Sequence, residues 1–169
     1  PNLIRHLSNS AATLKDQAST FDMVRTGIAM YGLSPDVKTM GSSQDLELEP
    51  AMTLKAEIQL VKRVPAGSPV GYGGTQITSS DTKLAIITMG YSDGIPRNTS
   101  SAAGVYAAGR RAPIIGRVSM DQFVVDLGAD SNAVSGEIVE VFGPLGYSID
   151  DWAAASGTIN YEIVTRIAT

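Results

Sequence analysis

The sequence predicts a mainly β protein, in which a short segment of α/β character precedes a small barrel or sandwich of β-strands. From Met52 onward, short apolar segments recur about every 8–15 residues between turn-forming residues, a spacing typical of such domains. Residues 1–34 differ in style and are too few to form a domain alone. Residues 35–50 are rich in Ser, Gly and Asp and read as a linker, so residues 51–169 form the predicted β domain.

The first segment is expected to contain one helix and one strand. Ser10 is a good N-cap and precedes residues that favour helix, so a helix is predicted from about that position. Phe21–Leu33 is a short apolar run interrupted by Arg25 and Gly27. Its poor alternation is typical of a parallel strand covered on both faces, which predicts a buried strand. We interpret the segment as the end of an α/β unit.

The β domain is expected to begin with a half-buried strand. Its apolar residues alternate with polar ones at the strand period of two: Leu54, Ala56, Ile58 and Leu60. Lys83–Met89 reads as a continuous apolar strand. A hairpin is predicted over Gly104–Val118 with its turn at Ala108–Arg111, and Pro113 places the second arm near a sheet edge. Two more strands are predicted at QFVVDL and EIVEVF.

The C-terminal residues are expected to contain at least one helix. In SIDDWAAASGT, Ser148 is a plausible N-cap, Asp150 and Asp151 suit the first turn, and Gly157 suits the stop. The last apolar segment, Ile159–Ile167, is compatible with either a helix or a strand.

Composition excludes several classes of function. The net charge of −4 over 169 residues argues against a nucleic-acid partner, because such proteins usually carry a basic patch. The chain has no cysteine, which removes disulfides and cysteine-ligated metal sites and fits a reducing compartment. No apolar stretch approaches the roughly 20 residues that span a bilayer, and no signal peptide is recognised. Because the chain starts at Pro1 without methionine, we interpret it as a piece of a longer protein.

Four clusters of residues are candidates for chemistry, and each also has an ordinary structural interpretation. In HLSNSAA, Ser10 at a helix start is suited to phosphate, or is simply a cap, and His6 is the only histidine. In MVRTGIAMYG, Arg25 needs a partner if it is buried and is an ordinary surface residue if it reaches solvent. The remaining clusters are MGYSDGIPR, with Tyr91, and IIGRVSMDQF, with Arg117, Met120 and Asp121.

The order and spacing of five motifs identify a resemblance. HLSNSAA, MVRTGIAMYGLSP, MGYSDGIPR, GRVSMDQ and TINYEI follow one another as in the second half of an alanine racemase, and the match covers nearly the whole chain. The resemblance implies that residues 1–34 are the last segments of a truncated (β/α)8 barrel and that the rest is the family's small β-barrel-like C-terminal domain. It also implies a pyridoxal 5'-phosphate cofactor bound to a lysine.

The resemblance also implies roles for individual residues. Tyr91 resembles the family's tyrosine base, whose phenol has an unperturbed pKa near 10 and needs that pKa lowered to act near neutrality. Arg25 resembles the arginine that keeps the pyridine nitrogen unprotonated, and His6 resembles its partner. Met120 resembles the residue whose backbone N–H holds the substrate carboxylate, and Arg117 and Ile159 resemble residues lining the access passage. Four residues resemble ligands of the cofactor phosphate: Ser10, Gly27, Ile28 and Tyr161.

The expected function is therefore interconversion of L-alanine and D-alanine for peptidoglycan precursors, in a cytoplasmic homodimer with shared active sites and no membrane or nucleic-acid partner. A racemase of serine or lysine and a non-catalytic β binding domain remain the alternatives. Ser119 stands where many relatives have cysteine. None of the lysines stands in the family's cofactor-lysine motif, so the chain alone is expected to be inactive: Lys15, Lys38, Lys55, Lys62 and Lys83.

Overall fold

The computed structural model of the chain describes residues 3–167. These residues form two compact units, of which the first ends at Met52 and the second begins at Thr53. The sequence-based boundaries at residues 34 and 50 stay predictions.

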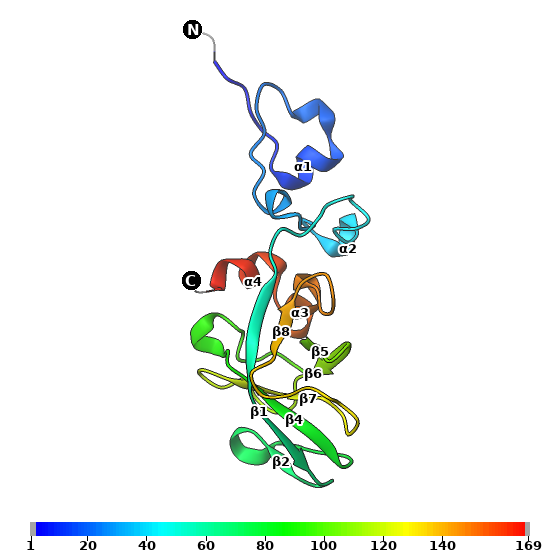
Figure 1. Cartoon of the computed structure of the whole chain (residues 1–169). Coiled ribbons are helices and arrows are strands. Elements are labelled where there is room, and N and C mark those ends of the chain that lie inside the picture. Colours follow the sequence, from blue (N-terminus) through cyan, green and yellow to red (C-terminus); the bar gives the residue numbers. More distant parts are fainter. Residues whose placement is uncertain (1–2, 168–169) are drawn as a thin grey trace. The chain divides into compact units, whose positions relative to one another are not determined.

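The first unit consists of short helices joined by irregular backbone (Figure 1). The helices are α1 (Ser10–Lys15), the 3-10 helices η1 (Gln17–Ser19) and η2 (Ile28–Tyr31), and α2 (Val37–Met40). The N-cap of α1 is Asn9, whose side chain accepts a hydrogen bond from the Ala12 N–H, so the prediction of Ser10 as the cap is wrong. Asn and Ser are about equally good caps, and here the Asn9 carboxamide oxygen reaches the free N–H group.

The predicted buried strand at Phe21–Leu33 is also wrong. Its only strand pairing within the described residues is an isolated parallel bridge between Met23 and His6, and η2 follows at Ile28. Phe21 and Met23 are exposed. A strand is extended by hydrogen bonds to neighbours on its two sides, and here the His6 segment pairs with it at one position. The bridge nevertheless joins two parallel segments through a helix, which is the connection expected of α/β structure.

The predicted linker carries structure of its own. It contains α2, which is capped by the Asp36 side chain. The Ser34 hydroxyl donates to the Gly41 carbonyl (2.6 Å), and Lys15 Nζ donates to the Thr39 carbonyl (3.0 Å). The first bond closes the segment of residues 34–41, and the second joins this segment to helix α1 within the first unit.

The second unit is a nearly closed antiparallel barrel, which confirms the mainly β fold class (Figure 1). Its strand order is β6-β5-β8-β1-β4-β7. The two ends of this order meet, because Ile114 bridges Val125 and the Ile115 N–H donates to the Val124 carbonyl (2.9 Å). The strands are β1 (Leu54–Val64), β4 (Thr82–Ile87), β5 (Gly104–Ala107), β6 (Arg110–Pro113), β7 (Phe123–Asp126) and β8 (Ile138–Phe142), with a separate ribbon of β2 (Pro69–Val70) and β3 (Gln76–Ile77).

One residue of the predicted alternation in β1 is misplaced. Ala56 and Ile58 are buried as expected, but Leu60 is 46% exposed. The pairing of β1 with β4 shifts register between Ile58 and Leu60, which marks a β-bulge. Because a bulge adds one residue to the strand, it reverses which side chains face the core beyond it.

The remaining strands lie close to their predicted positions, but the predicted hairpin turn at Ala108–Arg111 is too long, because Arg110 and Arg111 belong to β6. The hairpin of β5 and β6 turns at Ala108 and Gly109, which both have positive φ (49° and 82°) and so form a tight primed turn. Pro113 ends β6, at one end of the strand order. Strands β4, β7 and β8 lie where apolar runs predicted them.

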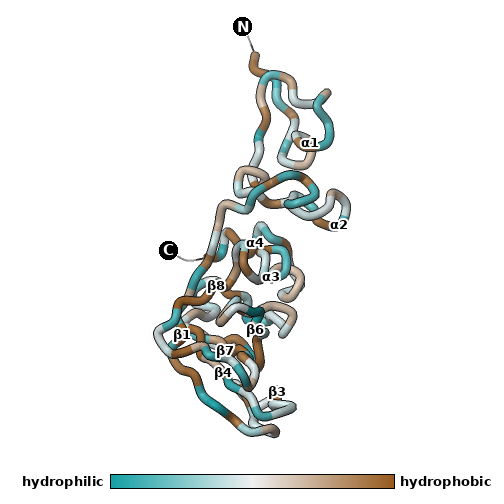
Figure 2. Tube along the Cα trace, turned by 45° about the vertical axis from the view of Figure 1, so that its right-hand side comes forward, coloured by the Kyte–Doolittle hydropathy of each residue, from teal (hydrophilic) through white to brown (hydrophobic). Residues whose placement is uncertain are grey.

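Two helices complete the second unit and lie at the opposite end of its sheet from the β2–β3 ribbon (Figures 1 and 2). Helix α3 (Ile149–Ala155) starts with the predicted Ser148 cap, and Asp151 completes a capping box. The ambiguous C-terminal segment is helix α4 (Asn160–Arg166). The Trp152 side chain of α3 is fully buried.

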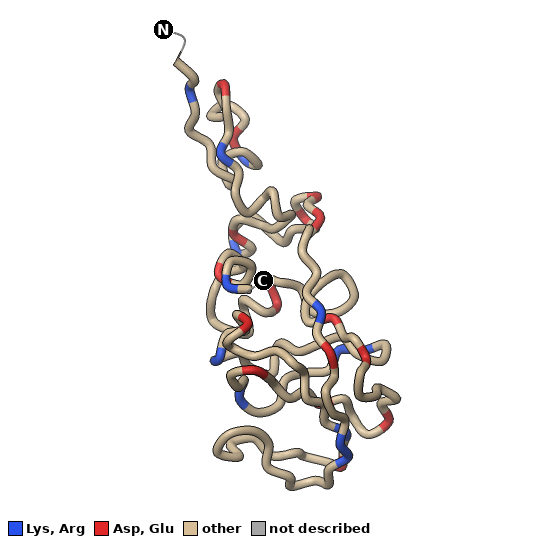
Figure 3. Tube along the Cα trace, turned by 60° about the vertical axis from the view of Figure 1, so that its left-hand side comes forward, with Lys and Arg blue, Asp and Glu red and all other residues tan. Residues whose placement is uncertain are grey.

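Hydrophobic stretches recur along the strands of the second unit (Figure 2), whereas both signs of charge are interspersed along both units (Figure 3). Among residues 3–167, no helix has the length and apolar character needed to cross a membrane.

Candidate functional site

The Tyr91 turn, residues 90–94, follows strand β4 and is built around two glycines. Residues Tyr91–Asp93 form the 3-10 helix η4, and Gly94 after it has a φ of 101°. The Asp93 carboxylate accepts a hydrogen bond from the Gly90 N–H (2.8 Å). Strand β4 therefore ends before a sharp turn, and this turn leaves Tyr91 41% exposed.

The Tyr91 turn is docked on the loop of residues 119–121. The Tyr91 N–H donates to the Ser119 carbonyl (3.0 Å), and the Ser92 N–H donates to the Met120 carbonyl (2.9 Å). A methyl group at Gly90 would overlap the Met120 carbonyl oxygen, so the close approach needs glycine. The structure thus joins two motifs that lie almost 30 residues apart in the sequence.

The 119–121 loop offers a backbone donor next to Tyr91. Met120 is 54% exposed. Within residues 3–167 its N–H donates to no acceptor, whereas its carbonyl accepts from both the Ser92 N–H and the Ser92 hydroxyl (2.8 Å). The Ser92 hydroxyl also contacts the Asp121 carboxylate (2.9 Å). The Met120 N–H shares its peptide plane with the Ser119 carbonyl, which the Tyr91 N–H fixes, so the N–H is held in place and left for a ligand acceptor.

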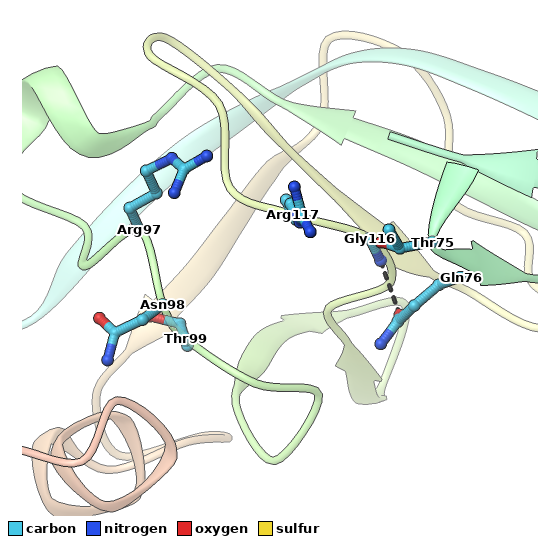
Figure 4. A pocket seen from close by; sticks show the side chains of 7 residues that line it. All are labelled: Thr75, Gln76, Arg97, Asn98, Thr99, Gly116 and Arg117. Atoms are coloured by element: carbon cyan, nitrogen blue, oxygen red, sulfur yellow. Dashed lines mark hydrogen bonds between the residues drawn. The ribbon is translucent and has the colours of Figure 1, made fainter. Parts of the chain in front are cut away.

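A pocket of about 440 Å³ adjoins this loop and contains Arg117 (Figure 4). Arg97, from the same motif as Tyr91, also lines it. In the described part of the chain, neither guanidinium has a carboxylate within salt-bridge distance. The Gly116 N–H donates to the Gln76 side chain (2.7 Å), and this bond fixes the backbone that lines the pocket next to Arg117. Two arginines without acidic partners suit a ligand that carries a carboxylate.

A second exposed tyrosine was missed by the sequence-based reasoning. Tyr72 is 72% exposed and lies in the 3-10 helix η3 (Tyr72–Gly74), in a turn whose glycines at 71, 73 and 74 all have positive φ. A methyl group at Gly71 would lie 3.2 Å from the Arg117 backbone nitrogen, so the turn packs against the pocket loop. The signal in the sequence is GYGG, in which glycines flank an aromatic residue on both sides.

Helix α4 carries the other two predicted residues of this unit. Ile159 precedes the helix and is exposed, and Tyr161 lies in its first turn, partly buried. The last turn of α4 contacts the Tyr91 turn, because a methyl group at Gly94 would overlap the Arg166 carbonyl oxygen.

In the first unit, Ser10, Gly27 and Ile28 lie together. The Ser10 hydroxyl oxygen accepts hydrogen bonds from the Gly27 N–H (2.9 Å) and the Ala29 N–H (3.4 Å), and the Ser10 residue is only 3% exposed. Neither the Ser10 O–H nor the Ile28 N–H donates to any acceptor in residues 3–167. A methyl group at Gly27 would meet no atom within 4 Å. An open space beside hydroxyl and N–H donors fits a phosphate group.

His6 and Arg25 form a second pair in this unit. The Arg25 guanidinium lies 2.6 Å from the His6 Nδ1, and the Arg25 N–H donates to the Ser8 carbonyl (2.8 Å). Sequence reasoning required a partner for Arg25 if it were buried, whereas the structure has Arg25 exposed and paired with an imidazole. Because a neutral imidazole accepts from the guanidinium without neutralising it, Arg25 keeps its positive charge available.

The predicted residues therefore fall into two groups, one in each unit. His6, Ser10, Arg25, Gly27 and Ile28 belong to the first, and Tyr91, Arg117, Met120, Ile159 and Tyr161 belong to the second.

Comparison with known proteins identifies the family. A family model described as the alanine racemase C-terminal domain matches residues 51–169, and that of the N-terminal domain matches residues 1–35. The chain belongs to the alanine racemase family. Its assignment rests on a match to more than half of its residues.

Individual alanine racemases are similar over nearly the whole chain. The alanine racemase of Frankia casuarinae is 49% identical over 167 residues, which cover 97% of this chain and 43% of that protein. The crystal structure of alanine racemase from D-cycloserine-producing Streptomyces lavendulae is 49% identical with a TM-score of 0.92, and covers 98% of this chain and 44% of that one. The crystal structure of the alanine racemase of Bacillus anthracis with bound L-Ala-P is 41% identical and has a TM-score of 0.84. The match covers 96% of this chain and 42% of that chain. The chain spans less than half the length of the alanine racemases it matches.

Proposed function

We propose that this chain is the C-terminal part of an alanine racemase, which interconverts L-alanine and D-alanine with pyridoxal 5'-phosphate. The observation that carries the proposal is the Tyr91 turn docked on the 119–121 loop, which brings a half-exposed tyrosine next to the loop that carries the free Met120 N–H. The names of relatives 49% identical to the chain support the substrate. Supply of D-alanine for peptidoglycan in the cytoplasm follows from the same family resemblance.

Racemisation requires that one group removes the Cα proton on one face and another delivers a proton on the opposite face. Bound pyridoxal 5'-phosphate would supply the electron-withdrawing system that makes this proton removable. Residues of this chain then have to bind, orient and exchange protons.

In the first unit, Ser10 and Ile28 would hold the cofactor phosphate through the Ser10 O–H and the Ile28 N–H, with Gly27 leaving open space beside them. The family resemblance adds the Tyr161 hydroxyl as a further phosphate ligand. Arg25, oriented by His6, is the residue that by the family resemblance would act on the pyridine nitrogen and would keep it unprotonated, since two adjacent positive charges repel.

In the second unit, the Met120 N–H holds the substrate carboxylate, because it is the free donor beside Tyr91. Arg97, Arg117 and Ile159 line the access passage. The two guanidinium groups favour the approach of an amino acid with its carboxylate forward.

The acid–base group on this unit is one of two tyrosines. Tyr91 is favoured by its position beside the Met120 N–H, and Tyr72 is favoured by its greater exposure and its contact with the Arg117 loop. In the full-length enzyme, Tyr→Phe at the acid–base position should lower racemisation at least about a hundredfold. The other substitution should have a smaller effect.

The measurement is racemisation in both directions for Tyr91→Phe, Tyr72→Phe and the control Tyr106→Phe, which lies on β5. Assays with L-serine and L-lysine beside L-alanine test the substrate. Near-wild-type rates for both Tyr91→Phe and Tyr72→Phe would contradict the proposal that a tyrosine of this unit is the base.

A homodimer with shared sites is also proposed, since the family resemblance pairs this tyrosine with a cofactor on the partner subunit. Mixing a protein that lacks the tyrosine with one that lacks the cofactor lysine should then restore part of the activity. Absence of activity, with mixed dimers shown to form, would indicate sites made within one chain.

A further inference from the structure

Helix α4 begins without the usual cap. Its N-cap residue, Ile159, makes no capping hydrogen bond with its side chain. The first residue of the helix, Asn160, is only 6% exposed, and its Nδ2 donates to the Asp150 carboxylate at 2.9 Å. The start of α4 is therefore attached to helix α3 through a side-chain hydrogen bond.

Helix α3 is itself fixed to the barrel. The Trp152 indole N–H donates to the Val141 carbonyl on β8 (2.7 Å), and its ring packs edge-on against Phe123 of β7 (centroids 5.9 Å apart). Asp150 lies two residues before Trp152 in the same helix. The Asp150 carboxylate therefore belongs to a helix that the buried Trp152 side chain fixes to the barrel.

The other end of α4 is held by close backbone contact with the Tyr91 turn, at Gly94 and the Arg166 carbonyl. Helix α4 is only about two turns long, so two attachments leave it little freedom to tilt or rotate.

We infer that Asp150 and Asn160 are positioning residues for Tyr161. Tyr161 directly follows Asn160, so the hydrogen bond between Asp150 and Asn160 fixes the rotation of the first turn of α4 and with it the direction of the Tyr161 side chain. The inference rests on the proposed function, in which the Tyr161 hydroxyl holds the cofactor phosphate. Asp150 touches neither cofactor nor substrate and acts through Tyr161.

The test is a double-mutant cycle in the full-length enzyme, read as the apparent Kd for pyridoxal 5'-phosphate added to the cofactor-free protein. Asp150→Ala should weaken binding about tenfold, the scale of one well-formed hydrogen bond. Asp150→Asn keeps an acceptor for Asn160 and should restore most of the affinity. In a Tyr161→Phe background, Asp150→Ala should add little further loss, because the contact that it positions is already gone.

Arg166→Ala is the matched control, since it removes an exposed ion pair with Glu162 from the same helix and should leave the affinity unchanged. If Asp150→Ala does not fold, Asn160→Ala breaks the same hydrogen bond from the other side. Equal losses of affinity from Asp150→Ala with Tyr161 present and in the Tyr161→Phe background would overturn the inference, as would wild-type affinity in Asp150→Ala. A wild-type enzyme that binds no cofactor would instead overturn the proposed function.

Discussion

Gly90 shows how one residue decides whether two motifs can meet. Gly90→Ala puts a methyl group onto the Met120 carbonyl oxygen, and relief requires the backbone of one loop to move. We expect the free energy of unfolding of the second unit to fall by about 1–3 kcal/mol, the usual cost of overpacking. Chemical denaturation followed by the fluorescence of Trp152, the only tryptophan, measures it.

Gly27→Ala is the control, because its methyl group meets no atom within 4 Å and lies in the first unit, so the unfolding of the second unit reported by Trp152 should stay unchanged. A Gly90→Ala protein as stable as wild type would show that the two loops are not packed as closely as described.

At the scale of single residues, the sequence predicts features that depend on neighbouring residues, but it does not predict how exposed a side chain is in the folded protein. The motif MGYSDGIPR drew attention to Tyr91 through the family resemblance, but the same reasoning passed over Tyr72, although its GYGG context indicates a turn. The Ser10 cap failed because Asn9 and Ser10 are both good caps, and only backbone geometry chooses between them.

At the scale of the element, the bulge in β1 makes two apolar residues unequal. Ile58 is completely buried, whereas Leu60 is nearly half exposed. Ile58→Ala should lower the free energy of unfolding by about 2–5 kcal/mol because it leaves a cavity. Leu60→Ala should cost less than about 1 kcal/mol, because it removes little buried surface. Equal costs in denaturation experiments would show that Leu60 faces the core after all.

Helix α3 provides a pH-dependent prediction. Burial raises the pKa of the Asp150 carboxyl above its ordinary value, which the hydrogen bond from Asn160 partly offsets and the charge of Asp151 reinforces. The folded state then binds the proton more readily than the unfolded state, so this group destabilises the fold as pH rises through the raised pKa. Asp150→Asn should therefore gain stability over wild type as pH rises above about 4, the ordinary pKa of an aspartate, through the raised pKa of the folded state. A difference between the two proteins that does not change with pH would contradict this.

Most elements of the second unit could be read from the sequence, since alternation, Gly turns and the Ser148 cap are local signals. The bulge could not, because Leu60 continues the period-two pattern and only pairing with β4 breaks it. The Phe21–Leu33 strand was predicted from its apolar composition, which does not report whether strands lie beside it.

For the whole molecule, the 169-residue chain alone should fold in its second unit and show no racemase activity. The barrel contains its own core, so Trp152 fluorescence should report a cooperative transition. The family resemblance implies a cofactor lysine, and we expect none of the lysines of this chain to serve as one. Assays with pyridoxal 5'-phosphate and L-alanine, with the full-length enzyme as control, should detect no D-alanine. D-alanine formed by the purified chain would contradict the prediction.

The pairing of β1 with β8 determines when the barrel can close during synthesis on the ribosome. Lys55 of β1 pairs with Glu140 of β8, so the barrel cannot close until β8 has been synthesised. At usual rates of translation, the residues between β4 and the end of β8 take on the order of 3–10 seconds to synthesise. During that interval β1 and β4 can pair, but the other edge of β1 stays unpaired and prone to aggregation. Nascent chains paused before Phe142 should therefore be the ones that chaperones capture.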